Sequence, residues 1–350
     1  MEEQKVIISE HLESALAEAI QECRPDRLLV LTDETTRQLC WPVVSSYDCL
    51  CDAQFITIKA GDDHKTLDSL SHVWQELQHL GATRHSLLIN LGGGMVTDLG
   101  GFAGSTFKRG LHIINIPTTL LAMVDASVGG KTGINFGGLK NEVGVFRNAS
   151  AVILDTTFLR TLDQENILSG YAEMLKHGLI EAPSCLSSLL SFDIEHPDLK
   201  ELGRMVAESV QVKQRIVLED PLEQGLRKAL NLGHTVGHAF ESLALQRVPV
   251  LHGYAVAWGL VCELYLSVVK CGFPTDRMRQ VVRFIFDHYG RMPITCDDYP
   301  TLLELMTHDK KNVAGQINFT LLSDVGKLML NQTATTAEIE ETLDFYREGM

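Results

Sequence analysis

The sequence predicts an N-terminal α/β domain followed by a domain that is mostly α-helical. Three observations indicate this architecture. In the first half of the 350-residue chain, short apolar runs rich in β-branched residues alternate with helical patterns. A glycine-rich turn follows one of these runs, and after about residue 160 long helical segments dominate. We therefore divide the chain into two domains, residues 1–160 and residues 161–350.

The first half contains five apolar runs with the composition of β-strands. They lie at residues 27–32, 53–58, 86–91, 111–116 and 151–154. Helical patterns lie between them, such as residues 64–80, where Leu67, Leu70, Val73 and Leu77 share one face. Strands that alternate with helices predict a parallel, Rossmann-like sheet that is covered on both sides.

The second half of the chain has the residue patterns of a helical domain. Its long helical patterns lie at residues 163–180, 199–217, 229–245, 254–270 and 275–289. Two short runs, 317–322 and 327–330, have strand character and predict one hairpin. The apolar stretch 255–269 contains Glu263 and is too short and too polar to span a bilayer, so we expect a buried core helix there.

The chain is acidic, with 45 Asp and Glu residues against 30 Lys and Arg residues. Nucleic acids and anionic membranes select basic surfaces, so we expect neither as a partner. A small anionic substrate remains compatible, because it requires only a local cluster of basic residues. The first five residues are polar and no apolar signal segment follows, and the eight cysteines are scattered without a CxxC pair. These features predict a cytoplasmic protein with reduced thiols.

A glycine-rich turn occupies the end of the predicted strand at 86–91. Gly92, Gly93 and Gly94 lead from this strand into a helical pattern. Such a turn lets the backbone approach a phosphate closely, and the helix N-terminus adds a partial positive charge. The turn is not the GxGxxG fingerprint, and a tight turn that binds nothing explains it equally well.

A second glycine run ends in Gly130, Lys131 and Thr132, which resembles the end of a P-loop. Asp125 stands where that motif requires its first glycine, so the P-loop interpretation fails. We interpret the glycines as a loop that directs Lys131 toward an anion.

Several histidines and a glutamate in the second half form a candidate metal site. His234 and His238 are four residues apart and share one face of a helix. Thr235 excludes the HExxH motif, whereas His252 and Glu173 supply a further imidazole and a carboxylate. One carboxylate and two imidazoles leave an open coordination position, which is typical of catalytic zinc. Ordinary core or surface histidines are the alternative, since the chain has thirteen.

Basic residues in apolar or glycine-rich surroundings are unusual in so acidic a chain. They are Lys131, Lys140, Lys176, Lys213 and Arg227, and Arg109 follows the end of a helical pattern. Any one of them could be an ordinary solvated charge. Their proximity to the glycine turns and the histidines favours a site for an anionic substrate.

Four long motifs in the middle of the chain carry a family resemblance. They are GGGMVTDLGGFAGSTFKRG, IPTTLLAMVDASVGGKTGIN, SGYAEMLKHGLI and LRKALNLGHTVGHAFE. In their order and spacing, within a match over about residues 25–325, the chain resembles the 3-dehydroquinate synthase family of sugar-phosphate cyclases. The resemblance implies a nucleotide-binding α/β domain and a helical domain that binds metal and substrate, assembled as a homodimer.

The resemblance also implies roles for individual residues. It places a metal ion, Zn²⁺ or Co²⁺, on Glu173, His234 and His252. It places NAD on Asp33, Asp62, Lys65, Gly93, Gly94, Val96, Asp98, Thr118, Thr119, Lys131, Lys140, Phe158 and Thr161. It gives catalytic roles to Asp125, Lys131, Lys176, Lys213 and His238. It gives substrate contacts to Arg109, Asn141, Arg227, Asn231 and Lys310, with Arg109 reaching the phosphate in the neighbouring subunit's site.

Two positions depart from the family pattern. Tyr254 stands where an acidic residue usually follows the metal histidine His252, which alters the surroundings of the metal. Asp62 stands where a nucleotide-contacting glutamate is usual and keeps the charge. Neither change removes a metal ligand.

The activity implied by the resemblance is a phosphate-eliminating cyclisation, a carbon–oxygen lyase reaction of the shikimate pathway toward aromatic amino acids. The substrate is 3-deoxy-D-arabino-heptulosonate 7-phosphate, and the products are 3-dehydroquinate and phosphate. NAD is reduced and regenerated within one turnover.

Three alternatives remain. One is a cyclase for another sugar phosphate, which Arg227 disfavours because a substrate without a carboxylate gives it nothing to bind. The second is a metal-dependent polyol dehydrogenase that releases NADH. The third is an inactive homologue, which only Tyr254 supports.

Overall fold

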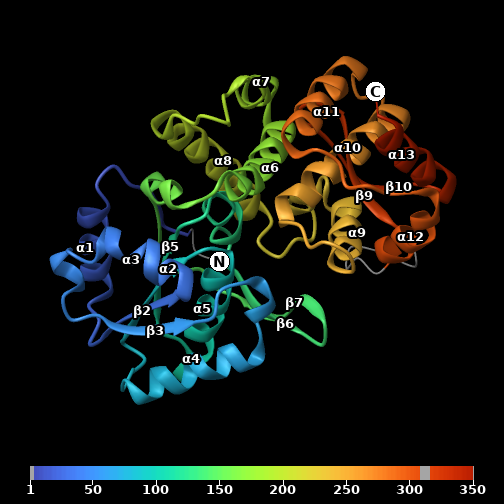
Figure 1. Ribbon diagram of the computed structural model, residues 1–350. Coiled ribbons are helices and arrows are strands. Elements are labelled where there is room, and N and C mark those ends of the chain that lie inside the picture. Colours follow the sequence, from blue (N-terminus) through green and yellow to red (C-terminus); the bar gives the residue numbers. More distant parts are fainter. Residues whose placement is uncertain (1–3, 308–315, 350) are drawn as a thin grey trace. The chain divides into compact units, whose positions relative to one another are not determined.

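The computed structural model describes residues 4–307 and 316–349 and groups the chain into two compact units (Figure 1). The first unit comprises Met1–Asp163 and Asp198–Gln214, and the second comprises Gln164–Pro197 and Arg215–Met350. Helix α8 (Leu199–Glu219) begins in the first unit and ends in the second.

The described part of the first unit is built on a six-stranded parallel sheet in the order β1-β8-β5-β4-β2-β3. The strands are β1 (Val6–Ile8), β2 (Leu28–Asp33), β3 (Gln54–Ile58), β4 (Leu87–Gly92), β5 (His112–Pro117) and β8 (Ala151–Leu154). This arrangement confirms the predicted Rossmann-like sheet, including the five predicted strands. Strand β1 was missed because it has only three residues, too few to show a pattern.

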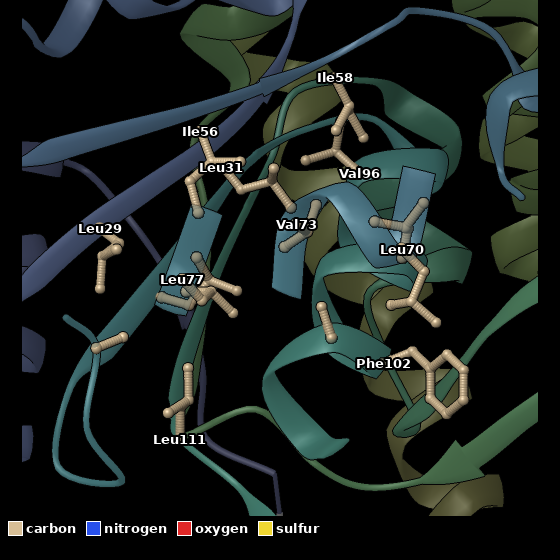
Figure 2. Packing of buried hydrophobic residues seen from close by; sticks show 14 of the residues in the cluster. Leu29, Leu31, Ile56, Ile58, Leu70, Val73, Leu77, Val96, Phe102 and Leu111 are labelled. Atoms are coloured by element: carbon tan, nitrogen blue, oxygen red, sulfur yellow. The ribbon is translucent and has the colours of Figure 1, made fainter. Parts of the chain in front are cut away.

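Helices cover this sheet and complete its core. They are α1 (Leu12–Cys23), α2 (Glu34–Leu39), α3 (Trp41–Val44), α4 (Leu67–His79) and α5 (Gly94–Thr106). The face of α4 that carries Leu70, Val73 and Leu77 is fully buried. Figure 2 shows these side chains in one cluster with Leu31 and Ile56 of the sheet. The helical spacing read from the sequence therefore identifies the buried face correctly at these three positions, but Leu67, predicted on the same face, begins α4 and is 47% exposed.

A β-hairpin that the sequence analysis missed projects from the first unit. It consists of β6 (Lys131–Phe136) and β7 (Leu139–Phe146), which pair antiparallel across the left-handed Gly137 and Gly138. Ile134 of β6 is buried in the core cluster, whereas every residue of β7 is exposed. Because glycines interrupt this segment and its apolar residues do not alternate regularly with polar ones, its sequence carries no clear strand pattern.

The described part of the second unit is mostly helical. Its helices are α6 (Gln164–Glu181), α7 (Pro183–Ser191), α9 (His234–Leu245), α10 (His252–Cys271), α11 (Thr275–Tyr289), α12 (Tyr299–Thr307) and α13 (Thr336–Glu348). Strands β9 (Asn318–Asp324) and β10 (Lys327–Thr333) form the predicted hairpin. These elements confirm a mostly helical C-terminal half.

Helix α10 is the central element of this unit. It packs against α6, α9, α11, α13 and β9. By length and composition alone it could cross a membrane, but 67% of its apolar window is buried inside the fold. Burial among its neighbours explains its apolar composition, as expected for a core helix.

The prediction of one continuous helix over residues 229–245 is wrong. The chain instead forms a 3₁₀ turn, η6 (Leu226–Asn231), and helix α9 begins only at His234. Gly233 separates the two with a left-handed backbone, φ 80°. The break places His234 in the first turn of α9, where the helix begins.

The core cluster generates a stability prediction. Replacing the fully buried Leu77 with alanine should lower the free energy of unfolding by about 2–5 kcal/mol, because it leaves a cavity against the sheet. Urea denaturation followed by circular dichroism measures the loss. Leu67→Ala, at a position of the same helix that is 47% exposed, is the matched control and should cost less than about 1 kcal/mol. Equal losses for the two variants would contradict the assigned burial.

Candidate functional site

The second unit brings together the predicted metal residues. Glu173 lies within α6, His234 begins α9 and His252 begins α10. Glu173 Oε1 is 3.3 Å from His234 Nε2 and 3.5 Å from His252 Nε2. A tetrahedral zinc ion with ligands about 2.0–2.1 Å away separates its ligand atoms by about 3.3 Å. Both measured spacings fit this geometry, and all three ligand atoms lie within 4.8 Å of one another, so they could hold a divalent metal with a further position left for a substrate or water.

The second nitrogen of each imidazole is held by the protein. His234 Nδ1 lies 3.1 Å from the backbone oxygen of Leu232, and His252 Nδ1 lies 3.2 Å from Glu241 Oε2. When Nδ1–H donates to such an acceptor, Nε2 presents its lone pair to the metal. Glu241 was not predicted as a site residue, although it follows His234 by two helical turns and ends the fourth family motif.

The electrostatics of this cluster centre on a carboxylate that is fully buried, Glu173. Neither of its oxygens has a hydrogen bond of normal geometry among the described residues, and Lys176 forms an ion pair with Oε2. Burial raises the pKa of Glu173, but Lys176, His234 and His252 outweigh burial and hold that pKa well below its usual value. The carboxylate is therefore ionised, as a metal ligand must be.

The two imidazoles differ in their pKa values. Burial lowers the pKa of His234 to about 4, so this ring is neutral and able to bind a metal. Burial also acts to lower the pKa of His252, but Glu241 and Glu173 outweigh it and raise that pKa to about 10. Metal binding at His252 must therefore displace a proton.

Two neighbouring residues complete the immediate surroundings. His238, one turn after His234, is exposed, and its ring centre is 5.3 Å from that of His234 and 6.0 Å from that of His252. Tyr254 packs edge-on against Trp258 and Tyr289, with ring centres 6.1 and 5.2 Å away. At the position where an acidic residue is usual, this chain therefore has an aromatic packing contact.

Two predicted substrate contacts of the second unit lie in and beside η6. Arg227 is 2% exposed, and its Nη1 donates to the backbone oxygen of Pro221 at 2.8 Å. Asn231 donates through Nδ2 to Glu223 Oε1 at 2.9 Å. Lys310, also predicted to contact substrate, lies outside the described residues.

The first unit presents a sheet edge of the kind at which ligands bind in α/β folds. The strand order reverses at β2, which pairs with β3 on one side and with β4 on the other. Ligands bind at such a switch point, outside the carboxyl ends of the strands. Gly93, the N-cap of α5, has no side chain to cover the first backbone N–H groups of that helix. A phosphate can occupy this position.

Other predicted NAD residues surround the same edge. Thr118 and Thr119 follow β5, and Thr118 is buried. Asp33 ends β2, and its carboxylate accepts a hydrogen bond from the Thr36 backbone N–H at 2.7 Å as the N-cap of α2. The Val96 side chain lies in the hydrophobic core, so only its backbone can face a nucleotide.

A chain of alternating charges extends from α5 to the hairpin. Buried Lys65 donates to Asp98 Oδ2 at 3.0 Å and lies 3.6 Å from Asp62 Oδ1. Asp62 also pairs with Lys140 of β7 at 3.4 Å. Burial raises the pKa of Asp98 more than Lys65 lowers it. Asp62 thus forms ion pairs with both Lys65 and Lys140.

The remaining predicted residues of the first unit are dispersed. Lys213 of α8 donates to Asp125 Oδ1 at 2.6 Å. Lys131 and Arg109 are exposed, and Arg109 has a left-handed backbone, φ 66°. Asn141 donates its backbone N–H to Asn135 Oδ1 at 2.9 Å.

Phe158 and Thr161 both lie in the 3₁₀ helix η5 (Thr156–Thr161). Phe158 is buried, and Thr161 Oγ1 donates to its backbone oxygen at 2.7 Å.

Solved structures of sugar-phosphate cyclases share this fold. A 2-deoxy-scyllo-inosose synthase, complexed with carbaglucose-6-phosphate, NAD⁺ and Co²⁺, superposes with a TM-score of 0.86 at 22% identity over 99% of this chain and 96% of that one. The 2-epi-5-epi-valiolone synthase from Streptomyces hygroscopicus subsp. jinggangensis, with NAD⁺ and Zn²⁺ bound, has a TM-score of 0.83 at 25% identity over 99% and 97%.

Sequence comparison defines the family within this class. The family models for the N- and C-terminal parts of 3-dehydroquinate synthase match residues 55–169 and 170–312. The 3-dehydroquinate synthase of Parabacteroides distasonis is 55% identical over 100% of this chain and 99% of its own length. That of Pyrococcus furiosus is 38% identical over 91% and 92%. The chain belongs to the 3-dehydroquinate synthase family.

The role of Glu241 can be tested by metal affinity. Glu241→Gln removes the charge that faces His252 Nδ1 and should weaken zinc binding about 10-fold, because such outer contacts orient the ligand ring. Competition between the metal-free protein and a chromogenic chelator measures the affinity. Glu341→Gln is the matched control, since Glu341 accepts an exposed bond from Tyr265, away from the histidine cluster. Unchanged affinity in Glu241→Gln would exclude the orienting role.

Proposed function

We propose that the chain converts 3-deoxy-D-arabino-heptulosonate 7-phosphate into 3-dehydroquinate and phosphate, as a 3-dehydroquinate synthase of the shikimate pathway. The observation that carries this proposal is the intact Glu173–His234–His252 cluster in a chain that is 55% identical, end to end, to a 3-dehydroquinate synthase. The outcome is that of a lyase, because phosphate leaves and NAD is regenerated.

NAD and a divalent metal, zinc or cobalt, are the proposed cofactors. The metal would supply polarisation of substrate hydroxyls, and NAD would accept and return a hydride. Glu173, His234 and His252 would hold the metal. Support comes from the valiolone synthase structure, which contains NAD⁺ and Zn²⁺ at 25% identity.

The proposed NAD residues belong to the first unit. The turn at Gly93 and Gly94 and the N-terminus of α5 would receive the pyrophosphate. The other proposed contacts are Asp33, Asp62, Lys65, Val96, Asp98, Thr118, Thr119, Lys131, Lys140, Phe158 and Thr161. Accordingly, we propose residues 1–160 as the NAD-binding domain and 161–350 as the metal- and substrate-binding domain.

The proposed substrate contacts divide by chemistry. For the phosphate we propose Lys131, Asn141, Asn231, Lys310 and, from a partner subunit, Arg109. For the carboxylate we propose Arg227, whose planar guanidinium matches two oxygens. Lys176, Lys213, His238 and Asp125 would orient hydroxyl groups and transfer protons. The departing phosphate can act as the base, so most of the rate enhancement would come from positioning and electrostatics.

The role of Arg109 requires a second copy of the chain, so we propose a homodimer. Arg109 is exposed and has a left-handed backbone, as does the preceding Lys108. Such a conformation is uncommon outside glycine, and it falls in the 3₁₀ turn Phe107–Arg109 that follows α5. A cytoplasmic location is also proposed, since all eight cysteines are free.

The reaction itself is the direct test. With catalytic NAD and zinc, the protein should release one phosphate per molecule of 3-deoxy-D-arabino-heptulosonate 7-phosphate, and NADH should not accumulate. Glu173→Gln should lower kcat about 100-fold or more, because it removes a charged ligand, while NAD binding is retained. Accumulation of NADH from a polyol, or turnover only of a sugar phosphate without a carboxylate, would overturn the proposal.

Arg227 tests the substrate's carboxylate. Arg227→Lys should lower kcat/KM about 10- to 100-fold, since a bidentate charge-assisted contact becomes a single one. Arg283→Lys is the control, because Arg283 is exposed on α11 and pairs with Asp287, and it should leave kcat/KM unchanged. If the Arg227 variant keeps wild-type kcat/KM, the carboxylate is bound elsewhere.

A further inference from the structure

We infer that Glu263 is a positioning residue of the metal site, because its carboxylate fixes the first turn of α9 and with it the ligand His234. Glu263 lies in α10 and is fully buried. The inference rests on the proposed metal site and adds a residue that neither the family motifs nor the ligand set contains.

Three hydrogen bonds carry the argument. Glu263 Oε2 accepts from the backbone N–H of Gly233 at 2.6 Å. Its Oε1 accepts from the N–H groups of Thr235 at 2.9 Å and Val236 at 3.2 Å. The first N–H groups of a helix have no partner within the helix and are usually capped by a local side chain. Here the N-cap is Gly233, which has no side chain, so a residue from another helix supplies the cap.

The bonded N–H groups lie on both sides of His234. Gly233 precedes the ligand and Thr235 follows it, so the carboxylate fixes the backbone at the ligand's own position. The same turn contains Leu232, whose backbone oxygen holds His234 Nδ1 at 3.1 Å. Displacement of this turn would therefore move both the His234 backbone and the acceptor that orients its ring.

Helices α9 and α10 are in close contact at this point. A Cβ atom on Gly233 would approach the side chain of Leu260 to 2.8 Å, and one on Gly259 would approach the Gly237 nitrogen to 2.7 Å. This contact lets a side chain of ordinary length reach from α10 to the start of α9.

Helix α10 thereby helps to position both histidine ligands. It begins with His252, and about three turns later it carries Glu263, which holds the helix of His234. A buried carboxylate is unfavourable unless it is compensated. The three N–H groups and the positive end of the α9 dipole provide that compensation.

Two substitutions separate a positioning role from a merely structural one. Glu263→Gln keeps the size of the side chain but has only one acceptor oxygen, so its NH₂ group faces an N–H donor. Glu263→Leu removes both acceptors at similar volume. Ser267→Ala is the matched control on the same helix, since Ser267 Oγ bonds Glu263 O and Leu322 N but nothing in α9 among the described residues.

The measurement uses the full-length metal-free protein, titrated with zinc against a chromogenic chelator and with cobalt for its d–d absorption spectrum, alongside thermal melting. Both Glu263 variants should bind zinc about 10- to 100-fold more weakly and show an altered cobalt spectrum. Ser267→Ala should keep the wild-type zinc affinity within about twofold, even if its melting temperature falls as far as that of the Glu263 variants.

Wild-type affinity and an unchanged cobalt spectrum in folded Glu263→Gln would overturn the inference. Equal weakening in Ser267→Ala would also overturn it, by showing that general destabilisation is the cause. Failure of the wild-type protein to bind one metal ion would instead refute the proposed metal site itself. The two failures are therefore distinguishable in one data set.

Discussion

The buried carboxylate of Glu173 is the constraint on which the second unit depends. A charge removed from water is strongly unfavourable unless other charges or dipoles replace its hydration. Lys176 and the two imidazoles surround it, yet no hydrogen bond of normal geometry reaches its oxygens in the described part of the chain. A divalent cation on Glu173, His234 and His252 would add direct bonds to the carboxylate, whose charge Lys176 and the two imidazoles already favour.

Other groups of the protein hold the two histidine rings in place beside that carboxylate. Each imidazole is oriented through its Nδ1, one by a backbone oxygen and the other by Glu241. The left-handed Gly233 places His234 in the first turn of α9, and Glu263 caps that turn from α10. Local backbone geometry and buried carboxylates thus determine where the ligand atoms lie.

In the first unit, the order of the parallel strands determines which edge of the sheet is open to a ligand. Parallel strands direct their carboxyl ends to one side, and the reversal of order at β2 leaves the turn at Gly93 accessible. Several side chains near this turn already form hydrogen bonds with other groups of the protein. Asp33 caps α2, and Lys65 bonds Asp98. The backbone N–H groups at the start of α5 are therefore donors that this edge can offer to an anion.

Composition and periodicity together predicted much of the fold. The buried positions Leu70, Val73 and Leu77 of α4 follow from helical spacing, and the five longer strands follow from apolar runs rich in β-branched residues. The break at Gly233 was missed because a glycine within a helical pattern is often tolerated. The β6–β7 hairpin was missed because β7 is exposed and carries no burial pattern.

The candidate metal site was only partly predictable. Histidine spacing raised the possibility of a metal, and the family resemblance selected Glu173, His234 and His252 from thirteen histidines and many carboxylates. Glu241 and Glu263 were not predicted, because their roles depend on contacts between helices that are distant in sequence. No spacing rule predicts such contacts.

X-ray absorption spectroscopy at the zinc edge tests the central claim most directly, on full-length protein loaded with one equivalent of zinc. The account predicts two imidazole nitrogens and one carboxylate oxygen, with a further oxygen from water in the open position. Thiolate sulfur in the coordination shell, or a site closed by four protein ligands, would contradict it.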